Sequence, residues 1–158
     1  HISVSTSGVV PGIYKLAEHN FPITLSISLH ASNDKTRSEI MRVNRKWNIA
    51  ELIKACKDYI KVTGRRISFE YAMISGVNDS DECARELGKK LKGMLCHVNL
   101  IPVNSVKERD YTKSSDNRIA GFIKTLEKYG INVTVRRTLG SDINASCGQL
   151  RRGEGPKQ

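Results

Sequence analysis

The sequence has no cysteines spaced closely enough to form a familiar metal or redox motif. Its four cysteines are Cys56, Cys83, Cys96 and Cys147, and no two of them lie within four positions of each other. This spacing excludes a zinc ribbon, a CxxC redox pair and an iron–sulfur ligand run among these residues. Thiols scattered in this way favour a reducing, cytoplasmic location over a disulfide scaffold.

Long apolar runs are also missing. No run is long enough to span a bilayer, and no basic-then-apolar signal segment opens the chain, so we expect no membrane association. Internal repeats, low-complexity tracts and interdomain linkers are absent from the sequence as well. With 158 residues, 39% of them hydrophobic, the expected organisation is one folded domain over residues 1–150 and a polar tail over residues 151–158.

Acidic residues are few relative to basic ones. There are 16 Asp and Glu against 26 Lys and Arg, which gives a formal net charge of +10. Such an excess suits a polyanion such as RNA, because each neutralised phosphate releases counterions. Solubilising lysines on helix faces, as in residues 89–92, would produce the same balance. Charge alone therefore leaves both interpretations open.

Strand-like and helix-like segments alternate along the chain, a pattern that favours parallel β/α units. Asn48 followed by Glu51 is typical of a helix start, and Gly64 of a helix end. The expected strands cover residues 2–5, 23–29, 66–74, 97–101 and 132–138. The expected helices cover residues 11–18, 33–41, 49–63, about 80–93 and about 115–130.

Polar residues stand where several of the expected strands stop. If the strands are parallel, residues 5–8, residues 28–30, Asn78, Asn104 and the segment after Thr138 lie at one edge of the sheet. Ser28 and His30 have the same parity along their strand, whereas Leu29 points to the opposite face. Taken singly, His30 could be an ordinary hydrogen-bonded histidine and Asn104 a turn residue. Together they predict a ligand site.

The chemistry of that site is not evident from spacing, because the pattern contains no carboxylate pair and no nucleophile–base arrangement. Small hydroxyl residues followed by Gly8 would let backbone amides approach a ligand closely. Asn104 offers both a hydrogen-bond donor and an acceptor, which suits a nucleobase or an amino-acid ligand.

Five segments, taken in order, resemble the radical S-adenosylmethionine RNA methyltransferases, and among them the enzymes that methylate C2 of adenine. These segments are residues 5–11, 28–31, 77–79, 99–104 and 142–150, the last of which contains Cys147-Gly148-Gln149-Leu150. The resemblance extends from Ser5 to about Leu150. It implies an α/β fold, a partial (β/α)6 radical SAM barrel, with strands three to six of the barrel plus a C-terminal strand extension in this chain.

The resemblance also implies a cofactor site and a reaction. Ser5, the run Ser28, Leu29 and His30, and Asn104 match positions that contact S-adenosylmethionine in that family. Cys147 matches a cysteine that is first methylated on sulfur. A 5′-deoxyadenosyl radical then abstracts hydrogen from this methyl group, and the resulting carbon radical adds to C2 of the target adenine. A second cysteine resolves the adduct. Because C2 of adenine is not nucleophilic, the cofactor must supply the difficult step.

Several parts of the family pattern have no counterpart in these residues. They are the CxxxCxxC ligands of the [4Fe-4S] cluster, a Gly-Glu-Pro segment and the resolving cysteine, so we expect no metal ligands here. The sequence is therefore expected to be the C-terminal part of such an enzyme and to be inactive alone. Its expected partners are large-subunit ribosomal RNA, transfer RNA and the N-terminal part of the same protein, and an open sheet edge would favour self-association.

Three other interpretations remain. Cfr-like enzymes share the chemistry but methylate adenine at C8, although residues 5–8 and 102–104 look more like the C2 enzymes. A basic α/β module could bind RNA without catalysis. A small-molecule half-barrel enzyme would leave the segment at Cys147 unexplained. For phosphate contact the basic candidates are Arg136, Arg137, Arg151, Arg152 and the loop at residues 107–113.

Overall fold

The computed structural model describes residues 1–104 and 109–136. Its strands are β1 (Ile2–Thr6), β2 (Ile23–Ser28), β3 (Ile67–Met73), β4 (Cys96–Pro102) and β5 (Asn132–Val135). Its helices are α1 (Val10–His19), α2 (Asp34–Ile40), α3 (Ile49–Thr63), α4 (Asp81–Leu91), α5 (Asp116–Lys128) and the short 3-10 helix η1 (Arg42–Arg45). Every strand and helix expected from the sequence is present, and most ends agree within one or two residues.

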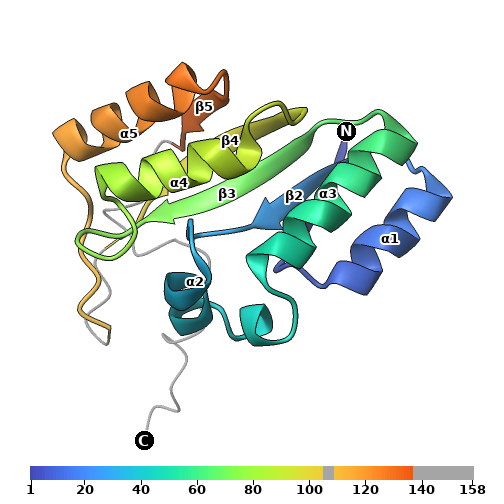
Figure 1. The fold of residues 1–158 in the computed structure, drawn as a ribbon, viewed down its shortest axis with the longest axis horizontal. Helices are drawn as coiled ribbons and strands as arrows, with labels where there is room; N and C mark the ends of the chain where they lie inside the picture. The colour runs from blue at the N-terminus through green and yellow to red at the C-terminus, as the bar shows by residue number, and fades with distance from the viewer. Residues whose placement is uncertain (105–108, 137–158) are drawn as a thin grey trace, which may run out of the picture.

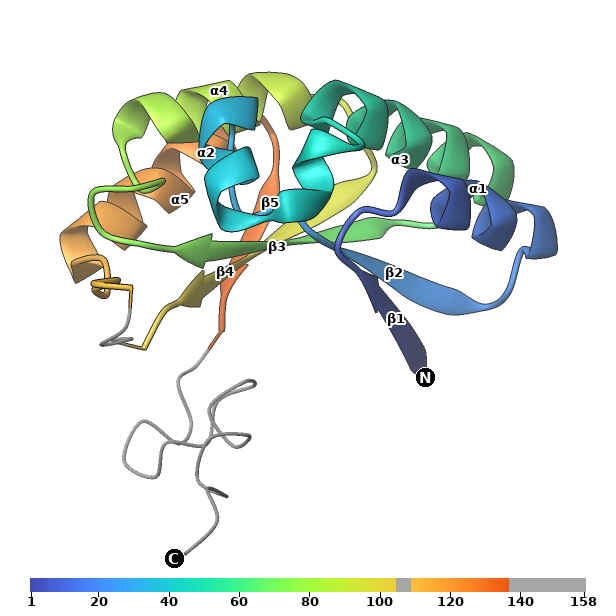
Figure 2. The same cartoon turned by 90° about the horizontal axis from the view of Figure 1, so that it is seen from below.

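The five strands form one sheet in the order β1-β2-β3-β4-β5, and every neighbouring pair is parallel. The prediction of parallel β/α units is therefore confirmed. The helices lie on one face of this curved sheet, and the other face is not covered by any helix of the described residues (Figures 1 and 2). The molecule is a half barrel with helices outside and an open inner face.

Alternation along the strands explains why only one face is covered. In β3, the buried residues Ile67, Phe69, Tyr71 and Met73 alternate with half-buried ones. The covered face packs against helix residues such as Leu52 of α3, which is fully buried. A sheet with helices on both faces would instead show nearly continuous apolar strands.

Helix ends follow the local chemistry that the sequence indicates. The side chain of Asn48 accepts a hydrogen bond from the N–H group of Glu51 at 2.9 Å, which caps the start of α3. Gly64 ends the helix with a φ of 67°, a left-handed conformation that favours glycine. Ser80 and Ser115 cap α4 and α5 in the same way.

Two features differ from the sequence prediction. The last strand was expected to reach residue 138 but ends at Val135, and the N–H group of Arg136 still bonds to the carbonyl of Leu100, while residues 137 and 138 lie outside the described residues. η1 was not expected, because three basic residues around Asn44 give no helical apolar pattern. The proposed domain boundary at residue 150 lies outside the described residues.

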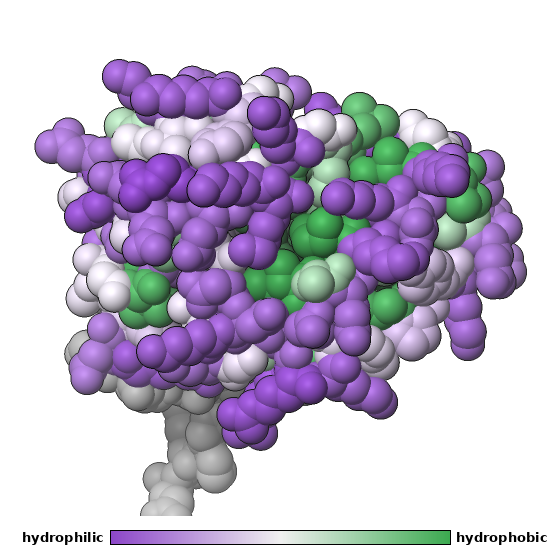
Figure 3. Space-filling view, viewed as in Figure 1, coloured by the Kyte–Doolittle hydropathy of each residue, from purple (hydrophilic) through white to green (hydrophobic). Residues whose placement is uncertain are grey.

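The helical side of the molecule is mostly hydrophilic, with apolar side chains gathered between α3 and α4 (Figure 3). Among the described residues, none of the helices has the length and apolar character needed to cross a membrane.

Candidate functional site

The carboxyl ends of β1 to β4 meet at one edge of the half barrel, which we call the mouth (Figures 1 and 2). Ser5 is opposite Ser26 in the sheet register, and Ser28 is opposite Glu70, so Ser5 and Ser28 both belong to the open inner face. Within the described part of the chain, neither serine hydroxyl has a hydrogen-bond partner. The structure thus leaves two hydroxyl groups near the mouth able to bind a ligand.

The loop after β1 is ordered by its own side chains. Thr6 Oγ1 accepts hydrogen bonds from the N–H groups of Gly8, at 3.1 Å, and Val9, at 3.4 Å. Gly8 has a φ of 108°, and a Cβ atom there would lie 3.0 Å from Arg37 Nη2 and 3.1 Å from Leu52 Cδ2. Gly8 therefore allows close packing inside the protein. Thr6 already accepts from the amides of Gly8 and Val9, and the expectation that other backbone amides of this loop approach a ligand stays a prediction.

A buried arginine holds the ends of β1 and β2 together. The Arg37 side chain is fully buried and donates to the carbonyl oxygens of Ser7 at 2.7 Å, Ser28 at 2.9 Å and Leu29 at 2.9 Å. A fourth bond reaches Asn44 Oδ1 at 3.0 Å. No carboxylate contacts the guanidinium among the described residues, and burial lowers the Arg37 pKa. The arginine thus fixes the loop geometry at the mouth.

Leu29 does not line the site with its side chain. That side chain is 1% exposed and belongs to the core under the helices. Its N–H group donates to the Glu70 carbonyl at 3.0 Å, and its carbonyl accepts from Arg37. Leu29 therefore anchors the strand end, and any contact with a ligand at this position comes from its two neighbours, as the parity argument indicates.

His30 leaves the strand geometry and turns back onto β3. Its φ is 59°, and its Nδ1 atom accepts a hydrogen bond from the N–H group of Ala72 at 2.9 Å. Burial first, and the positive charge of Arg37 second, lower the pKa of His30 to about 4. The imidazole is thus neutral near pH 7. Its hydrogen is on Nε2, which can donate to a ligand.

Two asparagines have different positions at the mouth. Asn78 is fully buried, accepts from the N–H group of Ile74 at 2.8 Å and donates to the carbonyls of His30 at 2.8 Å and Ala72 at 2.6 Å. Its amide is used to hold the ends of β2 and β3 together. Asn104 is half-buried and follows the end of β4 at Pro102 by two residues, at the same edge of the sheet as Ser28.

Sequence reasoning missed a row of polar side chains across the inner face. The Glu70 carboxylate accepts from Asn99 Nδ2 at 2.9 Å, and Asn99 Oδ1 accepts from the Thr134 hydroxyl at 3.2 Å. Thr134 also hydrogen-bonds the ring of His97 at 2.8 Å. The missed signal was polar–apolar alternation in residues 67–73 and 96–102, which marks a sheet with one uncovered face.

Two cysteines of the described residues, Cys56 and Cys96, are buried packing residues. Burial raises the pKa of Cys56 to about 12 and that of Cys96 to about 11, as expected of packing residues. Cys147, the predicted methyl carrier, lies outside the described residues. Within residues 1–104 and 109–136, no group of three His, Cys, Asp or Glu side chains is placed to hold a metal ion. These residues thus do not offer the ligands that an iron–sulfur cluster needs.

The basic residues predicted to contact RNA are only partly described. Lys113 and Arg136 line one open groove of about 420 Å³ between α5 and the ends of β4 and β5. Arg137, Arg151, Arg152 and residues 107–108 lie outside the described residues.

The chemistry of the mouth fits a small polar cofactor with amino-acid and nucleoside parts. The polar groups there include the hydroxyls of Ser5 and Ser28 and the neutral imidazole N–H of His30, and the amide of Asn104 follows the end of β4. Ligands of parallel α/β folds bind at this edge, because the strand ends and loops converge on it.

Solved structures share this architecture. A radical SAM methyltransferase from Sphaerobacter thermophilus superposes with a TM-score of 0.90 and 51% identity, over 94% of this chain and 43% of that chain. A domain of pyruvate-formate lyase-activating enzyme from Bacteroides vulgatus superposes with a TM-score of 0.67 at 16% identity, over 87% of this chain and 81% of that one, which shows the fold alone. The described residues therefore form part of a radical SAM partial barrel.

Curated relatives match most of this chain, although no protein-family model matches it. The chain is 62% identical over 152 residues to the probable dual-specificity RNA methyltransferase RlmN of Alkaliphilus oremlandii and 54% identical to that of Desulforamulus reducens. Each match covers 96% of this chain but only 44% and 43% of the relative. The chain is thus similar to one part of these RlmN proteins and spans less than half of their length.

Proposed function

We propose that this chain is the cofactor- and substrate-positioning part of a radical S-adenosylmethionine RNA methyltransferase that modifies C2 of adenine. The observation that carries the proposal is the mouth itself, where Ser5, Ser28 and His30 from two adjacent strand ends face one space. Similarity to RlmN proteins over 96% of the chain supports it. The proposed substrates are large-subunit ribosomal RNA and transfer RNA, in the cytoplasm.

Each residue at the mouth has a proposed role. Bound S-adenosylmethionine, with an iron–sulfur cluster held by another part of the protein, supplies the radical chemistry that unreactive C2 of adenine requires. The Ser5 and Ser28 hydroxyls and the Asn104 amide orient the cofactor by hydrogen bonds. His30 donates from Nε2 as a neutral ring, so it adds no positive charge beside a cationic sulfonium. Cys147 carries the transferred methyl group.

The cofactor site is tested by replacing Ser5 in a full-length enzyme that contains this chain. Ser5→Ala should weaken S-adenosylmethionine binding by about twofold to tenfold, the usual effect of one lost hydrogen bond. Ser3→Ala is the matched control, because Ser3 lies on the same strand and face, one pleat further from the mouth. Equal affinities of the two variants, measured by equilibrium dialysis, would argue against a role for Ser5.

The reaction is tested by product analysis of adenine nucleosides from RNA treated with the same enzyme. Methylation at C2 supports the proposal, and methylation at C8 identifies a Cfr-like enzyme instead. Cys147→Ala should abolish methylation while RNA affinity is retained. If no methylated adenine forms with the intact enzyme although RNA binds, the chain belongs to a non-catalytic RNA-binding module.

The 158-residue chain alone should not cleave S-adenosylmethionine, because its described residues offer no cluster ligands. We also propose that β1, which is an edge strand among residues 1–104 and 109–136, receives a further strand from the rest of the enzyme. Ile2 on this edge is 65% exposed. The isolated chain should therefore self-associate. Formation of 5′-deoxyadenosine by the purified chain would refute the first of these expectations. A monomer whose sedimentation does not depend on concentration would refute the expected self-association.

A further inference from the structure

η1 carries a group of exposed basic side chains that the cofactor site does not use. Residues 40–50 contain Arg42, Arg45 and Lys46 and no Asp or Glu, and all three side chains are exposed. The two ion pairs formed within the described residues, Lys54–Asp58 and Arg118–Asp81, involve none of them. We call these three residues the η1 patch. Its positive charge is therefore uncompensated by any direct ion pair.

The η1 patch has a defined position because the 3-10 helix is tied down by a buried residue in its middle. Asn44 is 3% exposed and donates through Nδ2 to Asp34 Oδ1 at 3.1 Å and to the Ser38 hydroxyl at 2.9 Å. Asp34 Oδ1 also accepts from the N–H group of Ile49 at the start of α3. The middle of η1 is therefore linked to α2, which is itself bonded to the start of α3, and the three basic side chains are exposed.

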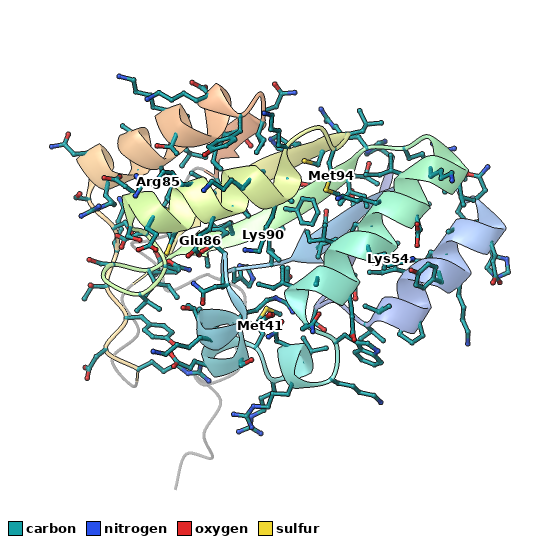
Figure 4. All side chains as sticks on the ribbon, in the orientation of Figure 1. Met41, Lys54, Arg85, Glu86, Lys90 and Met94 are labelled. Atoms are coloured by element: carbon teal, nitrogen blue, oxygen red, sulfur yellow. The ribbon has the colours of Figure 1, made fainter. Side chains whose placement is uncertain are left out.

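The same asparagine connects η1 to the mouth. Asn44 Oδ1 accepts from Arg37, whose other three bonds hold the carbonyls of Ser7, Ser28 and Leu29. A continuous chain of hydrogen bonds thus joins the strand ends that carry Ser5 and Ser28 to the 3-10 helix. Figure 4 shows the location: Met41, the residue before η1, lies between α2 and the start of α3, and Lys90 lies apart on α4.

One side chain of the patch is positioned by an aromatic ring. Lys46 Nζ lies 4.7 Å from the centre of the Trp47 ring, a cation–π contact that restricts the lysine. Exposed Lys and Arg side chains that form no ion pair within the described residues are suited to phosphate groups, which bind by charge and hydrogen bonding without reading sequence. Figure 3 shows hydrophilic side chains along the lower edge of the molecule, where α2 and the start of α3 lie in the same view of Figure 1.

We propose that the η1 patch binds phosphate groups of the RNA substrate and so places the target nucleotide at the mouth. The inference rests on the proposed function and adds to it a contact surface within the described residues. The η1 patch is separate from the groove lined by Lys113 and Arg136, which lies beside β5, the last strand of the sheet. Because the Arg37–Asn44 hydrogen bond links η1 to the strand ends, the fold sets the distance between a phosphate bound at η1 and a cofactor bound at the mouth.

The test uses the full-length enzyme and an unmodified transfer RNA transcript as the probe. Arg42→Gln/Arg45→Gln/Lys46→Gln removes the three charges and keeps polar side chains of similar length. The matched control is Lys61→Gln/Lys89→Gln/Lys128→Gln, which removes the same net charge from the last turns of α3, α4 and α5, at the edge of the sheet opposite the mouth. All six positions are exposed, so both variants should fold.

RNA affinity is measured by filter binding between about 50 and 200 mM salt, where counterion release dominates. We expect the η1 variant to lose about tenfold or more in affinity, and the salt slope to fall by about one for each phosphate contact removed. The control variant should keep nearly the wild-type slope. S-adenosylmethionine binding without RNA should be the same in all three proteins.

Failure of this inference differs from failure of the proposed function. If the wild-type enzyme methylates adenine but the η1 variant matches the control in affinity and salt slope, the η1 patch does not bind RNA and the inference is wrong. If the wild-type enzyme neither binds nor methylates RNA, the proposed function itself is wrong, and the inference falls with it.

Discussion

Replacing Arg37 with methionine should lower the free energy of unfolding by about 3–5 kcal/mol, the usual cost of removing one partner from a buried charged network. Methionine fills much of the same volume but donates no hydrogen bond. The carbonyls of Ser7, Ser28 and Leu29 and the Asn44 amide oxygen then lose a donor. Each such loss at a buried site costs about 1–3 kcal/mol, and the variant recovers part of this because it no longer buries a cation.

The expected loss is a large share of the stability of a domain, which is typically about 5–15 kcal/mol. It should appear in urea unfolding followed by circular dichroism as a lower midpoint with an unchanged slope. Arg37→Lys keeps the charge but cannot reach four acceptors, so it should be destabilised almost as much. Arg42→Met is the control at an exposed position. A loss below about 1 kcal/mol for Arg37→Met would refute the argument that Arg37 joins the strand ends.

Three further predictions concern single side chains. The pKa of folded His30 is about 4, below its usual 6.5, so its contribution of up to about 3 kcal/mol to the free energy of unfolding should be complete above pH 6.5 and lost as the pH falls toward 4. His30→Gln should remove this pH dependence of the unfolding free energy. An NMR titration that shows the His30 imidazole gaining its proton near pH 6.5 would contradict the prediction. Gly88→Ala should destabilise the protein by about 1–3 kcal/mol in urea unfolding, because a Cβ atom there would overlap the Tyr129 ring; an unchanged midpoint would show that the ring moves aside. Iodoacetamide should alkylate half-buried Cys83 but not Cys56, whose thiol has a pKa of about 12, and mass spectrometry of the native protein would detect the reverse order.

The strand and helix pattern could be predicted because it is local. Asn48 and Ser80 carry side-chain oxygens that cap the next turn, and Gly64 adopts the left-handed conformation that ends α3, so the chemistry near each boundary determines it. The convergence of Ser5 and Ser28 on one edge followed from the parallel order alone. The predicted roles of these serines and of Asn104 stay predictions, and Cys147 lies outside the described residues.

Other features depend on residues that are distant in sequence. Arg37 reads as an ordinary helix residue between Thr36 and Ser38, yet it reaches a carbonyl thirty positions earlier along the chain. Gly8 is needed for a similar reason, because Arg37 and Leu52 pack against it. No short-range pattern reveals such contacts, since they exist only after the β1 and β2 ends are brought beside α2 and α3.

The amino-acid order by itself determined the parallel β/α units, the covered apolar face and the polar strand ends, because alternation and capping act between near neighbours. Tertiary structure alone decided how those ends are held: by the buried Arg37 guanidinium bonded to backbone carbonyls, by Asn78 between two strands and by a neutral His30 bonded to β3. The physical reason is that buried polar groups must find partners across the fold, and which partners they find depends on packing that no single segment encodes.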